Sequence, residues 1–264
     1  MQTVANNMRI YLRSRPALLA PLRAKEAYLF QQNLPFKGPV LDIGCGDGFF
    51  ASVITGAGDS KQKSINKIDA GLDIVGSRIE QAQKSGVYKK TVTYNGRRMP
   101  FADDTFATVI SNSTLEHIAD LPIILKETYR VMKRGGEFMT TVIAAPWAEH
   151  YFGNKILGAW YKRWMTKKQE HVNLFTHRQW DDVFIKAGFK IICKIGHARA
   201  LVSTWTDILH FLGIPNLISY SLTGKWVFFP KLAEKTFPIS YFADMVMSDC
   251  NETDAVAIYY ELRK

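Results

Sequence analysis

The stretch Pro39-Val40-Leu41-Asp42-Ile43-Gly44-Cys45-Gly46-Asp47-Gly48-Phe49-Phe50 decides the fold of this chain. A short strand-forming run, 40–43, leads into three glycines separated by single residues, and a helix-compatible segment follows at 49–55. Strand, glycine turn and helix in this order are typical of nucleotide sites in α/β sheets. Glycine has no Cβ, so the backbone of such a turn can adopt positive φ and approach a ligand closely.

The spacing of the glycines narrows the kind of site. A dinucleotide site reads G-x-G-x-x-G, and a P-loop ends in Gly-Lys-Ser/Thr. This turn reads G-x-G-x-G, has Asp42 before it and lacks the lysine. In these residues it resembles motif I of the class I S-adenosylmethionine (SAM)-dependent methyltransferases. The structural alternative is a tight turn that binds no ligand.

Length and composition set the bounds of the interpretation. The 264 residues suit one large α/β domain with an insertion, or two small domains, and 47% hydrophobic residues supply a sizeable core. A net charge of +10 is compatible with an acidic partner or a membrane surface. Three cysteines without C-x-x-C spacing favour a reducing compartment and argue against a disulfide framework or zinc site. Because the start of the chain has no long apolar segment, we expect no signal peptide and a cytoplasmic protein.

A second acidic position follows the next strand. Residues 67–72 predict a strand that ends at Asp73, and a helical pattern follows at 74–80. A carboxylate at this end of a strand can accept two hydrogen bonds from a vicinal diol, as in ribose-binding α/β sites. Asp69 lies inside the strand and is therefore the second choice for this role.

Later motifs resemble the ubiquinone/menaquinone-biosynthesis methyltransferases. A predicted strand at 91–94 leads into Asn95-Gly96-Arg97-Arg98-Met99-Pro100-Phe101, and a strand at 107–110 follows an acidic turn. The family pattern is Asp-Ala-x-x-Leu-Pro-Phe and then Phe-Asp-x-Val. Asn95 stands where the family has the Asp that meets the adenine amine, and an Asn can still accept from that amine without charge. Ala107 replaces the second Asp.

Two further motifs extend the resemblance to residues 39–143. Leu115-Glu116-His117-Ile118 is similar to the family's Leu-Glu-His-Ile/Val turn after the fourth strand. Arg130-Val131-Met132-Lys133-Arg134-Gly135-Gly136 is similar to its Arg-Val-Leu-Lys-Pro-Gly-Gly. We expect a helix at 121–132 that the paired glycines end, and a fifth strand at 138–143.

The remaining chain is less familiar. Aromatic and basic residues crowd 145–170, a capped helix is expected at 177–187, and strands are expected at 189–195 and 254–261. The segment 201–224 holds one acid, Asp207, and no lysine or arginine. Its glycine and proline predict two short helices and not a spanning helix. Four interpretations of these helices stay open. They are a hydrophobic substrate tunnel, an element that lies in a membrane interface together with the following lysines, a core helix and a dimer contact.

The predicted architecture is a doubly wound, Rossmann-like α/β sheet of seven strands with the last strand antiparallel, as the resemblance implies. We expect a single domain over 1–264. Its parts are an N-terminal helical segment at 1–38, a SAM-binding core at 39–143, an acceptor-side lid with the sixth strand at 144–200, a hydrophobic insertion at 201–248 and the last strand at 249–264.

The resemblance implies methyl transfer from SAM. The aromatic and apolar segments after residue 144 favour a small, hydrophobic, isoprenoid- or lipid-like acceptor, and we expect the protein in the cytoplasm or on the cytoplasmic face of a membrane. The resemblance also implies that Gly44 and Gly46 meet the methionine part of SAM, that Asp73 binds the ribose and that Asn95 and Gly96 meet the adenine. The full cofactor set is Asp42, Gly44, Cys45, Gly46, Asp73, Ile74, Asn95, Gly96, Asn112 and Thr114. No metal ligand and no nucleic-acid partner are expected, and no oligomeric state is indicated.

His117 is the candidate base for an oxygen or acidic-carbon acceptor, because imidazole titrates near neutral pH. A structural histidine at this turn is the alternative, and His150 and His171 are weaker candidates. Two other classes of protein stay open: a nucleotide-dependent oxidoreductase and a non-catalytic, SAM-binding methyltransferase-like protein.

Overall fold

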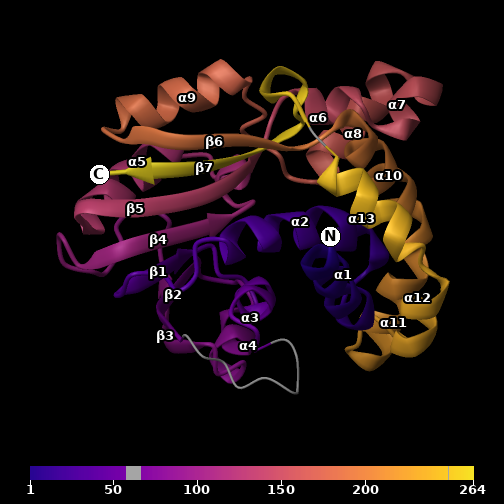
Figure 1. Ribbon diagram of the computed structural model, residues 1–264, viewed down its shortest axis with the longest axis horizontal. Helices are drawn as coiled ribbons and strands as arrows, with labels where there is room; N and C mark the ends of the chain where they lie inside the picture. Colours follow the sequence, from indigo (N-terminus) through magenta and orange to yellow (C-terminus); the bar gives the residue numbers. More distant parts are fainter. Residues whose placement is uncertain (58–66, 249) are drawn as a thin grey trace. The chain divides into compact units, whose positions relative to one another are not determined.

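The computed structural model describes residues 1–57, 67–248 and 250–264. It divides the chain into two compact units that alternate along the sequence (Figure 1). The sheet unit comprises 30–144, 171–195 and 258–264, and the helical unit comprises 1–29, 145–170 and 196–257. The polar extension expected before the second strand falls mostly on residues 58–66, which lie outside the described residues.

The sheet has seven strands in the order β3-β2-β1-β4-β5-β7-β6. The strands are β1 (Val40–Ile43), β2 (Ile68–Ile74), β3 (Tyr88–Tyr94), β4 (Phe106–Asn112), β5 (Met132–Ile143), β6 (Lys190–Ala198) and β7 (Ala257–Arg263). Pairing is parallel from β3 through β5, and β7 runs antiparallel to its neighbours. The predicted doubly wound, Rossmann-like sheet with an antiparallel last strand is confirmed.

The strand order reverses at β1, which pairs with both β2 and β4. The register sets the carboxyl ends of the parallel strands beside one another. Ile43 of β1 lies opposite Leu72, and Asp73 of β2 lies opposite Thr93. In open α/β sheets, ligands bind at this edge, where the strand order reverses.

Helices connect these strands within the sheet unit: α3 (Phe49–Ile54), α4 (Ile79–Lys84), the 3₁₀ turn η2 (Leu115–His117), α5 (Leu121–Val131) and α9 (His177–Lys186). Helix α9 begins with the predicted cap, a capping box in which Thr176 and Gln179 bond each other's backbone N–H groups. Its Trp180 is fully buried and donates from Nε1 to the carbonyl of Ile143, 3.1 Å away.

Two predicted helix boundaries are wrong. Ile74 is the last residue of β2, and α4 begins only at Ile79, because Gly76 has φ +90° and interrupts the helical pattern. Helix α5 ends at Val131 and not at the paired glycines, because Met132 is already extended and starts β5. Gly136 instead permits close packing of backbone, since a Cβ there would lie 2.8 Å from the carbonyl oxygen of Lys133.

The helical unit is built from short helices, and the predicted helical N-terminus is present. The elements are α1 (Gln2–Ser14), η1 (Ala17–Leu19), α2 (Ala20–Gln31), α6 (Pro146–Glu149), α7 (Phe152–Leu157), α8 (Ala159–Lys168), α10 (Ala200–Leu212), α11 (Ile214–Thr223), α12 (Pro230–Thr236), α13 (Ile239–Met247) and η3 (Glu252–Asp254). Among the described residues, none of the helices has the length and apolar character needed to cross a membrane.

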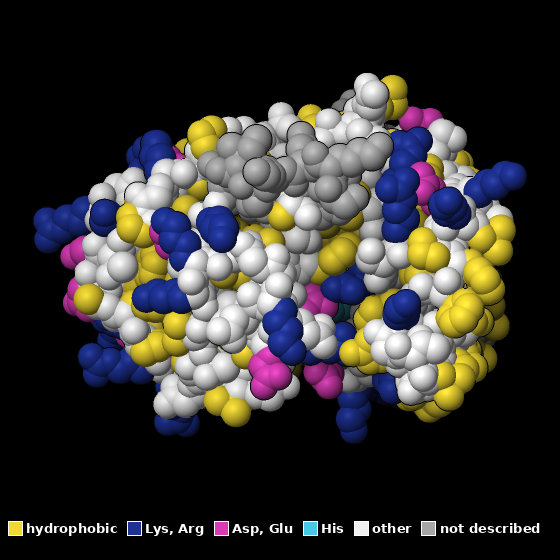
Figure 2. Space-filling view, turned by 90° about the horizontal axis from the view of Figure 1, so that it is seen from below, with side chains coloured by type: hydrophobic (Ala, Val, Ile, Leu, Met, Phe, Trp, Pro, Cys, Tyr) yellow, Lys and Arg dark blue, Asp and Glu magenta, His cyan; other side chains and the backbone are white. Residues whose placement is uncertain are grey.

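Helix α10, the first half of the apolar segment, belongs to the core of the helical unit. Its one acid, Asp207, is fully buried and accepts hydrogen bonds from the Tyr161 hydroxyl at 2.6 Å and from Gly153 N at 2.9 Å. Leu209 is buried as well. The second half differs, because α11 and α12 bury none of their residues, and hydrophobic side chains cover the surface in the part of Figure 2 where these helices lie.

Candidate active site

The glycine turn after β1 is shaped differently at each of its glycines. Gly44 (φ +74°) and Gly46 (φ +55°) both lie in the left-handed region that favours glycine. A Cβ on Gly44 would overlap the Thr114 side chain, whereas a Cβ on Gly46 would meet nothing within 4 Å. A Cβ on Gly48 would press on the Tyr88 ring at 3.1 Å. The turn is therefore packed at its two outer glycines and open at the middle one.

Asp73 fixes this turn from the end of β2. One carboxylate oxygen accepts from Gly46 N at 2.7 Å, and the other accepts from Ile74 N at 2.7 Å. Burial raises the pKa of the Asp73 carboxyl, and these two N–H groups counteract the effect. Each oxygen keeps a second lone pair, so the carboxylate can still accept hydrogen bonds from a diol.

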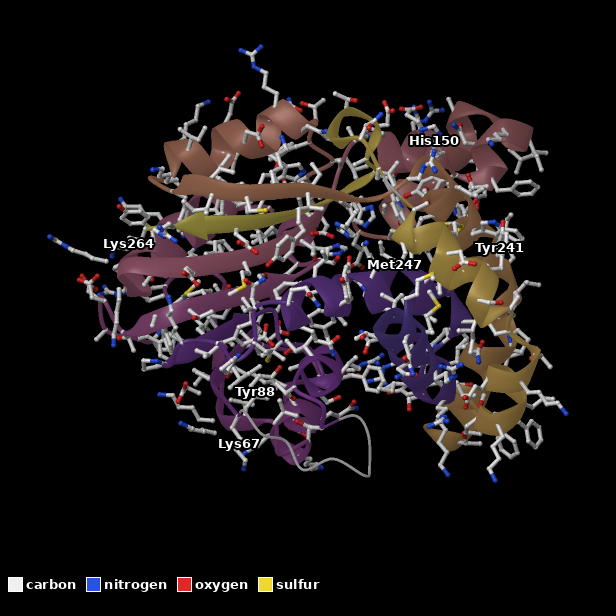
Figure 3. All side chains as sticks on the ribbon, viewed as in Figure 1. Lys67, Tyr88, His150, Tyr241, Met247 and Lys264 are labelled. Carbon is white, nitrogen blue, oxygen red and sulfur yellow. The ribbon has the colours of Figure 1, made fainter. Side chains whose placement is uncertain are left out.

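Asp42 in β1 and Cys45 within the turn are both buried. Asp42 is buried and accepts a 2.6 Å hydrogen bond from the hydroxyl of Tyr88, at the start of β3 (Figure 3). Burial raises the pKa of Asp42 to about 7, and the charge of Asp73 adds to the rise. Burial also raises the pKa of the Cys45 thiol, so it stays neutral. The Asp42 carboxylate is thus bonded to the side chain of Tyr88 in β3.

We expect Asp42→Asn to change how stability depends on pH. The folded pKa of about 7 lies above the unfolded value near 3.9, so the parent loses stability as pH rises from about 4 to 7, by roughly 4 kcal/mol. Asparagine cannot ionise and still accepts from Tyr88. Denaturation at pH 5 and pH 8 measures the free energy of unfolding, and that of the variant should increase relative to the parent's at pH 8. A pH-independent difference would contradict the burial of an ionising carboxyl.

A cavity of about 380 Å³ opens at the carboxyl ends of β1 to β4, a volume within the range of small-ligand sites. Its walls are formed by Ile43, Gly44, Asp73, Ile74, Tyr94, Asn95, Gly96, Arg97, Thr114, His117, Ile118, Ala119 and Asp120. The structure thus brings together most of the predicted site residues. The predicted residues Asp42, Cys45, Gly46 and Asn112 are not among those that line it.

Asn95 shapes the wall after β3. Its side-chain oxygen accepts from Arg97 N at 3.1 Å and from Arg98 N at 3.3 Å, which closes a turn. The oxygen expected to meet adenine is therefore already engaged in the turn. Arg130 of α5 anchors the following loop by donating to the carbonyls of Met99 and Phe101, which gives the Arg-Val-Met-Lys motif a positioning role.

The turn after β4 brings Thr114 to the glycines. Asn112 accepts through its side-chain oxygen from the Thr141 hydroxyl at 2.9 Å, so this side chain is bound to β5. Ser113 has φ +44° and donates from N to the carbonyl of Thr141. This unusual conformation turns the chain so that Thr114 contacts Gly44 and lines the cavity.

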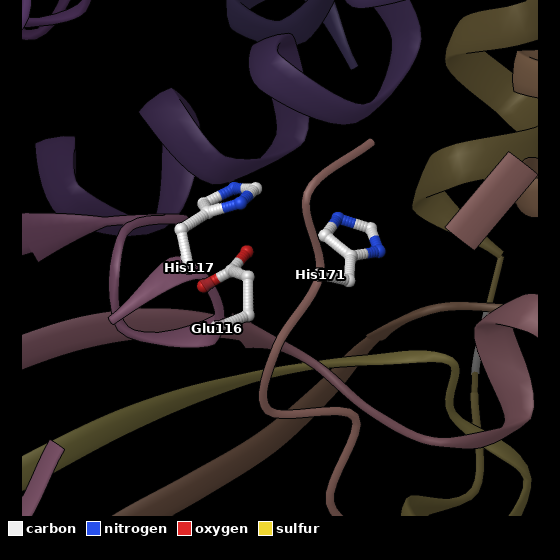
Figure 4. Close-up of side chains that lie close together, drawn as sticks. All are labelled: Glu116, His117 and His171. Carbon is white, nitrogen blue, oxygen red and sulfur yellow. The ribbon is translucent and has the colours of Figure 1, made fainter. Parts of the chain in front are cut away.

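A second segment completes the turn that carries His117. Asn173 donates from its amide to the carbonyls of Leu115 (3.0 Å) and Ile118 (2.6 Å), so residues 171–173 lie along η2. Figure 4 shows His171 facing Glu116 and His117 from this separate segment. The two imidazole rings are 5.1 Å apart between centroids.

The same three residues form a group that could hold a divalent metal. Glu116, His117 and His171 each offer one ligand atom, and these atoms lie within 4.8 Å of one another. Carboxylate and imidazole are ligands of zinc and other transition metals. No metal ligand was expected from the sequence, and its spacing could not indicate this group because His171 is far from the Glu116-His117 pair along the chain.

The sequence interpretation also missed cavity residues that adjoin predicted ones. Tyr94 ends β3, and Arg97 follows the Asn95-Gly96 pair. Ile118, Ala119 and Asp120 connect η2 to α5. Tyr94 ends a predicted strand and the others lie in the connections that follow predicted strands, and this position was the signal that could have found them, since loops at this edge of the sheet form the site.

An open α/β sheet with a cavity where its strand order reverses is an arrangement typical of nucleotide-type binding sites. A family model described as a methyltransferase domain matches residues 11–194, and the chain belongs to this methyltransferase family. The demethylmenaquinone methyltransferase of Symbiobacterium thermophilum is 29% identical over 115 residues, which is 41% of this chain and 44% of that protein. The ubiquinone biosynthesis O-methyltransferase of Bartonella quintana is 22% identical over 188 residues, 69% of this chain and 74% of that protein.

A solved geranyl diphosphate methyltransferase in complex with SAM has the same fold. It superimposes with a TM-score of 0.54 at 14% identity and covers 90% of this chain and 84% of that one. SAM is the cofactor of the chain, which is a SAM-dependent methyltransferase. The residues present fit it, because the space at Gly46 is open and Asp73 has lone pairs left for a ribose. The family match argues against a nucleotide-dependent oxidoreductase.

Proposed function

We propose that the chain transfers the methyl group of SAM to a small, hydrophobic, isoprenoid- or lipid-like acceptor. The observation that carries the proposal is the position of His117, on the wall of the cavity that Gly44, Asp73 and Thr114 also line. Two curated relatives support the acceptor class, since one is named for demethylmenaquinone and the other for ubiquinone biosynthesis.

The protein's contribution is orientation and removal of a proton. Bound SAM supplies a methyl group that its sulfonium already activates. Asp73 and the glycine turn would hold the cofactor and orient its methyl carbon toward the acceptor. The transfer would form a bond from the acceptor oxygen or carbon to that carbon and break the carbon–sulfur bond, whose electron pair would stay on sulfur. His117 accepts the proton that the acceptor releases.

The acceptor can be found with methyl-labelled SAM. The full-length chain is incubated with an organic extract of membranes from its source cells, and mass spectrometry follows the label. We expect a labelled product in the organic phase that forms with the parent and not with Asp73→Ala. Labelled products confined to water-soluble compounds would contradict the acceptor class. A chain that binds SAM and labels nothing in either phase would favour the non-catalytic alternative.

His117→Ala should lower turnover of that acceptor by about 100-fold or more, which is the usual contribution of a general base. SAM affinity should change little, and activity should recover partly at high pH, where the acceptor loses its proton unaided. His171→Ala is the matched control, because it removes the neighbouring imidazole. Equal losses of turnover in the two variants, together with inactivation of the parent by EDTA, would indicate that a metal bound by both histidines is needed for turnover. That result would contradict the assignment of His117 as the general base.

A further inference from the structure

The helical unit exposes a continuous set of large apolar side chains on α11 and the segments beside it. Each of the following is between 44% and 78% exposed: Phe211, Leu212, Ile214, Leu217, Ile218, Leu222, Phe228, Phe229 and Leu232. Figure 2 shows hydrophobic side chains gathered where α11 and α12 lie. Soluble monomers rarely expose apolar patches of this extent unless the patch is an interaction site. We call this set the α11 surface.

Helix α11 is amphipathic, but its apolar face points away from the protein. Ile214, Leu217, Ile218 and Leu222 follow the i, i+3, i+4, i+8 spacing of one helix face, and all four are exposed. Three residues of its other side, Asn216, Ser219 and Tyr220, are half-buried and contact the loop that follows the helix. A helix that folds for burial within its own chain would show the opposite arrangement.

The polar side of α11 holds the following loop and gives the surface a fixed shape. Asn216 donates from its amide to the carbonyl of Trp226 at 2.7 Å, and Ser219 donates from its hydroxyl to the carbonyl of Lys225 at 2.8 Å. Tyr220 stacks on Trp226 with the ring centroids 4.1 Å apart. Helix and loop therefore form one unit in which the outward apolar face is already organised.

The charge around this surface has one sign. No aspartate or glutamate occurs between residues 208 and 233, while Lys225, Lys231 and Lys235 are exposed. The nearest acid that follows, Glu234, is paired with Arg13 at 2.6 Å and with Arg9 at 3.5 Å. An apolar face with lysines beside it fits a partner that has an apolar interior and an anionic outer layer.

We propose that the α11 surface docks on an anionic lipid membrane, with α11 lying in the plane of the interface. At ten residues the helix is about 15 Å long, half of the hydrocarbon core, so it can lie in the interface but cannot cross it. The leucine and isoleucine side chains enter the acyl region, and the lysines reach the headgroup phosphates. This proposal is independent of the acceptor proposed above.

Vesicle co-sedimentation of the full-length chain tests the proposal. Phosphatidylcholine vesicles are compared with vesicles that also contain phosphatidylglycerol, at low and at high salt. We expect binding to the anionic vesicles that weakens in salt. The double variant Leu217→Ser, Ile218→Ser should bind at least tenfold more weakly. The double variant Lys225→Ala, Lys231→Ala should lose about fivefold per lysine and most of the salt dependence.

The matched control is Ile123→Ser with Ile185→Ser, two exposed aliphatic residues on α5 and α9 of the sheet unit. It should bind vesicles like the parent, and calorimetry with SAM should show all variants folded. A parent that never sediments with anionic vesicles overturns the proposal. Light scattering that shows a dimer, which Leu217→Ser with Ile218→Ser dissociates, would assign the surface to a second copy instead.

Discussion

Replacing Asp73 by alanine should weaken SAM binding by about 100-fold or more, or roughly 3 kcal/mol, because hydrogen bonds to a charged group contribute about 1.5–3 kcal/mol. Two effects act together. The variant loses the acceptor for the ribose hydroxyls, and it leaves Gly46 N and Ile74 N without the carboxylate that fixes the glycine turn. Isothermal titration calorimetry with SAM measures the loss directly.

Asp69 provides the matched control for this experiment. It lies at the start of the same strand, β2, away from the cavity residues at its other end. Its carboxylate accepts from Val40 N at 2.7 Å and pairs with Lys89 of β3. Asp69→Ala should keep the parent's SAM affinity, although it loses some stability. Similar losses of affinity in both variants would mean that Asp73 acts through the general stability of β2, and the ribose assignment would fail.

Gly46→Ala should abolish measurable SAM binding while the chain stays folded. Gly46 does not line the cavity itself, but its N–H is bonded to Asp73, which does. A Cβ at this position meets no protein atom within 4 Å, and we assign this open space beside Asp73 to the cofactor. The positive φ of +55° adds about 1–2 kcal/mol of backbone strain, which a stable chain tolerates. Calorimetry with SAM and thermal denaturation separate the two effects.

Gly135→Ala is the control for strain alone. Gly135 has φ +73° and equally open surroundings, but it lies at the start of β5, away from the carboxyl ends of the strands. Both variants should lose similar stability, and only Gly46→Ala should lose SAM. If Gly46→Ala binds SAM as tightly as Gly135→Ala does, the cofactor does not occupy the space at the glycine turn.

Features that depend on neighbouring residues were predictable from the sequence. The first strand, the glycine turn and the helix after it are contiguous, and their hydrophobic pattern and spacing show what they form. The same holds for Asp73, at the end of β2, and for Asn95, which directly follows β3. Their pairing in a parallel sheet then brings them to one cavity.

Features that depend on contacts between distant segments could not be predicted from the sequence. The contact of Asp42 with Tyr88, the support of η2 by Asn173 and the approach of His171 to His117 join parts of the chain that no local pattern connects. The two halves of the apolar segment also look alike in composition. Burial of Asp207 by Tyr161 and Gly153 shows that α10 is core, while the hydrogen bonds of Asn216 and Ser219 direct the apolar face of α11 outward.

One measurement tests the central claim most directly: calorimetric titration of the full-length parent chain with SAM and, separately, with NAD. The cavity at the ends of β1 to β4, with Asp73 and the open glycine turn, predicts one SAM bound per chain, with binding that Asp73→Ala weakens and Asp69→Ala does not. No heat of binding is expected with NAD. A chain that binds NAD, or that binds neither ligand, would contradict the account.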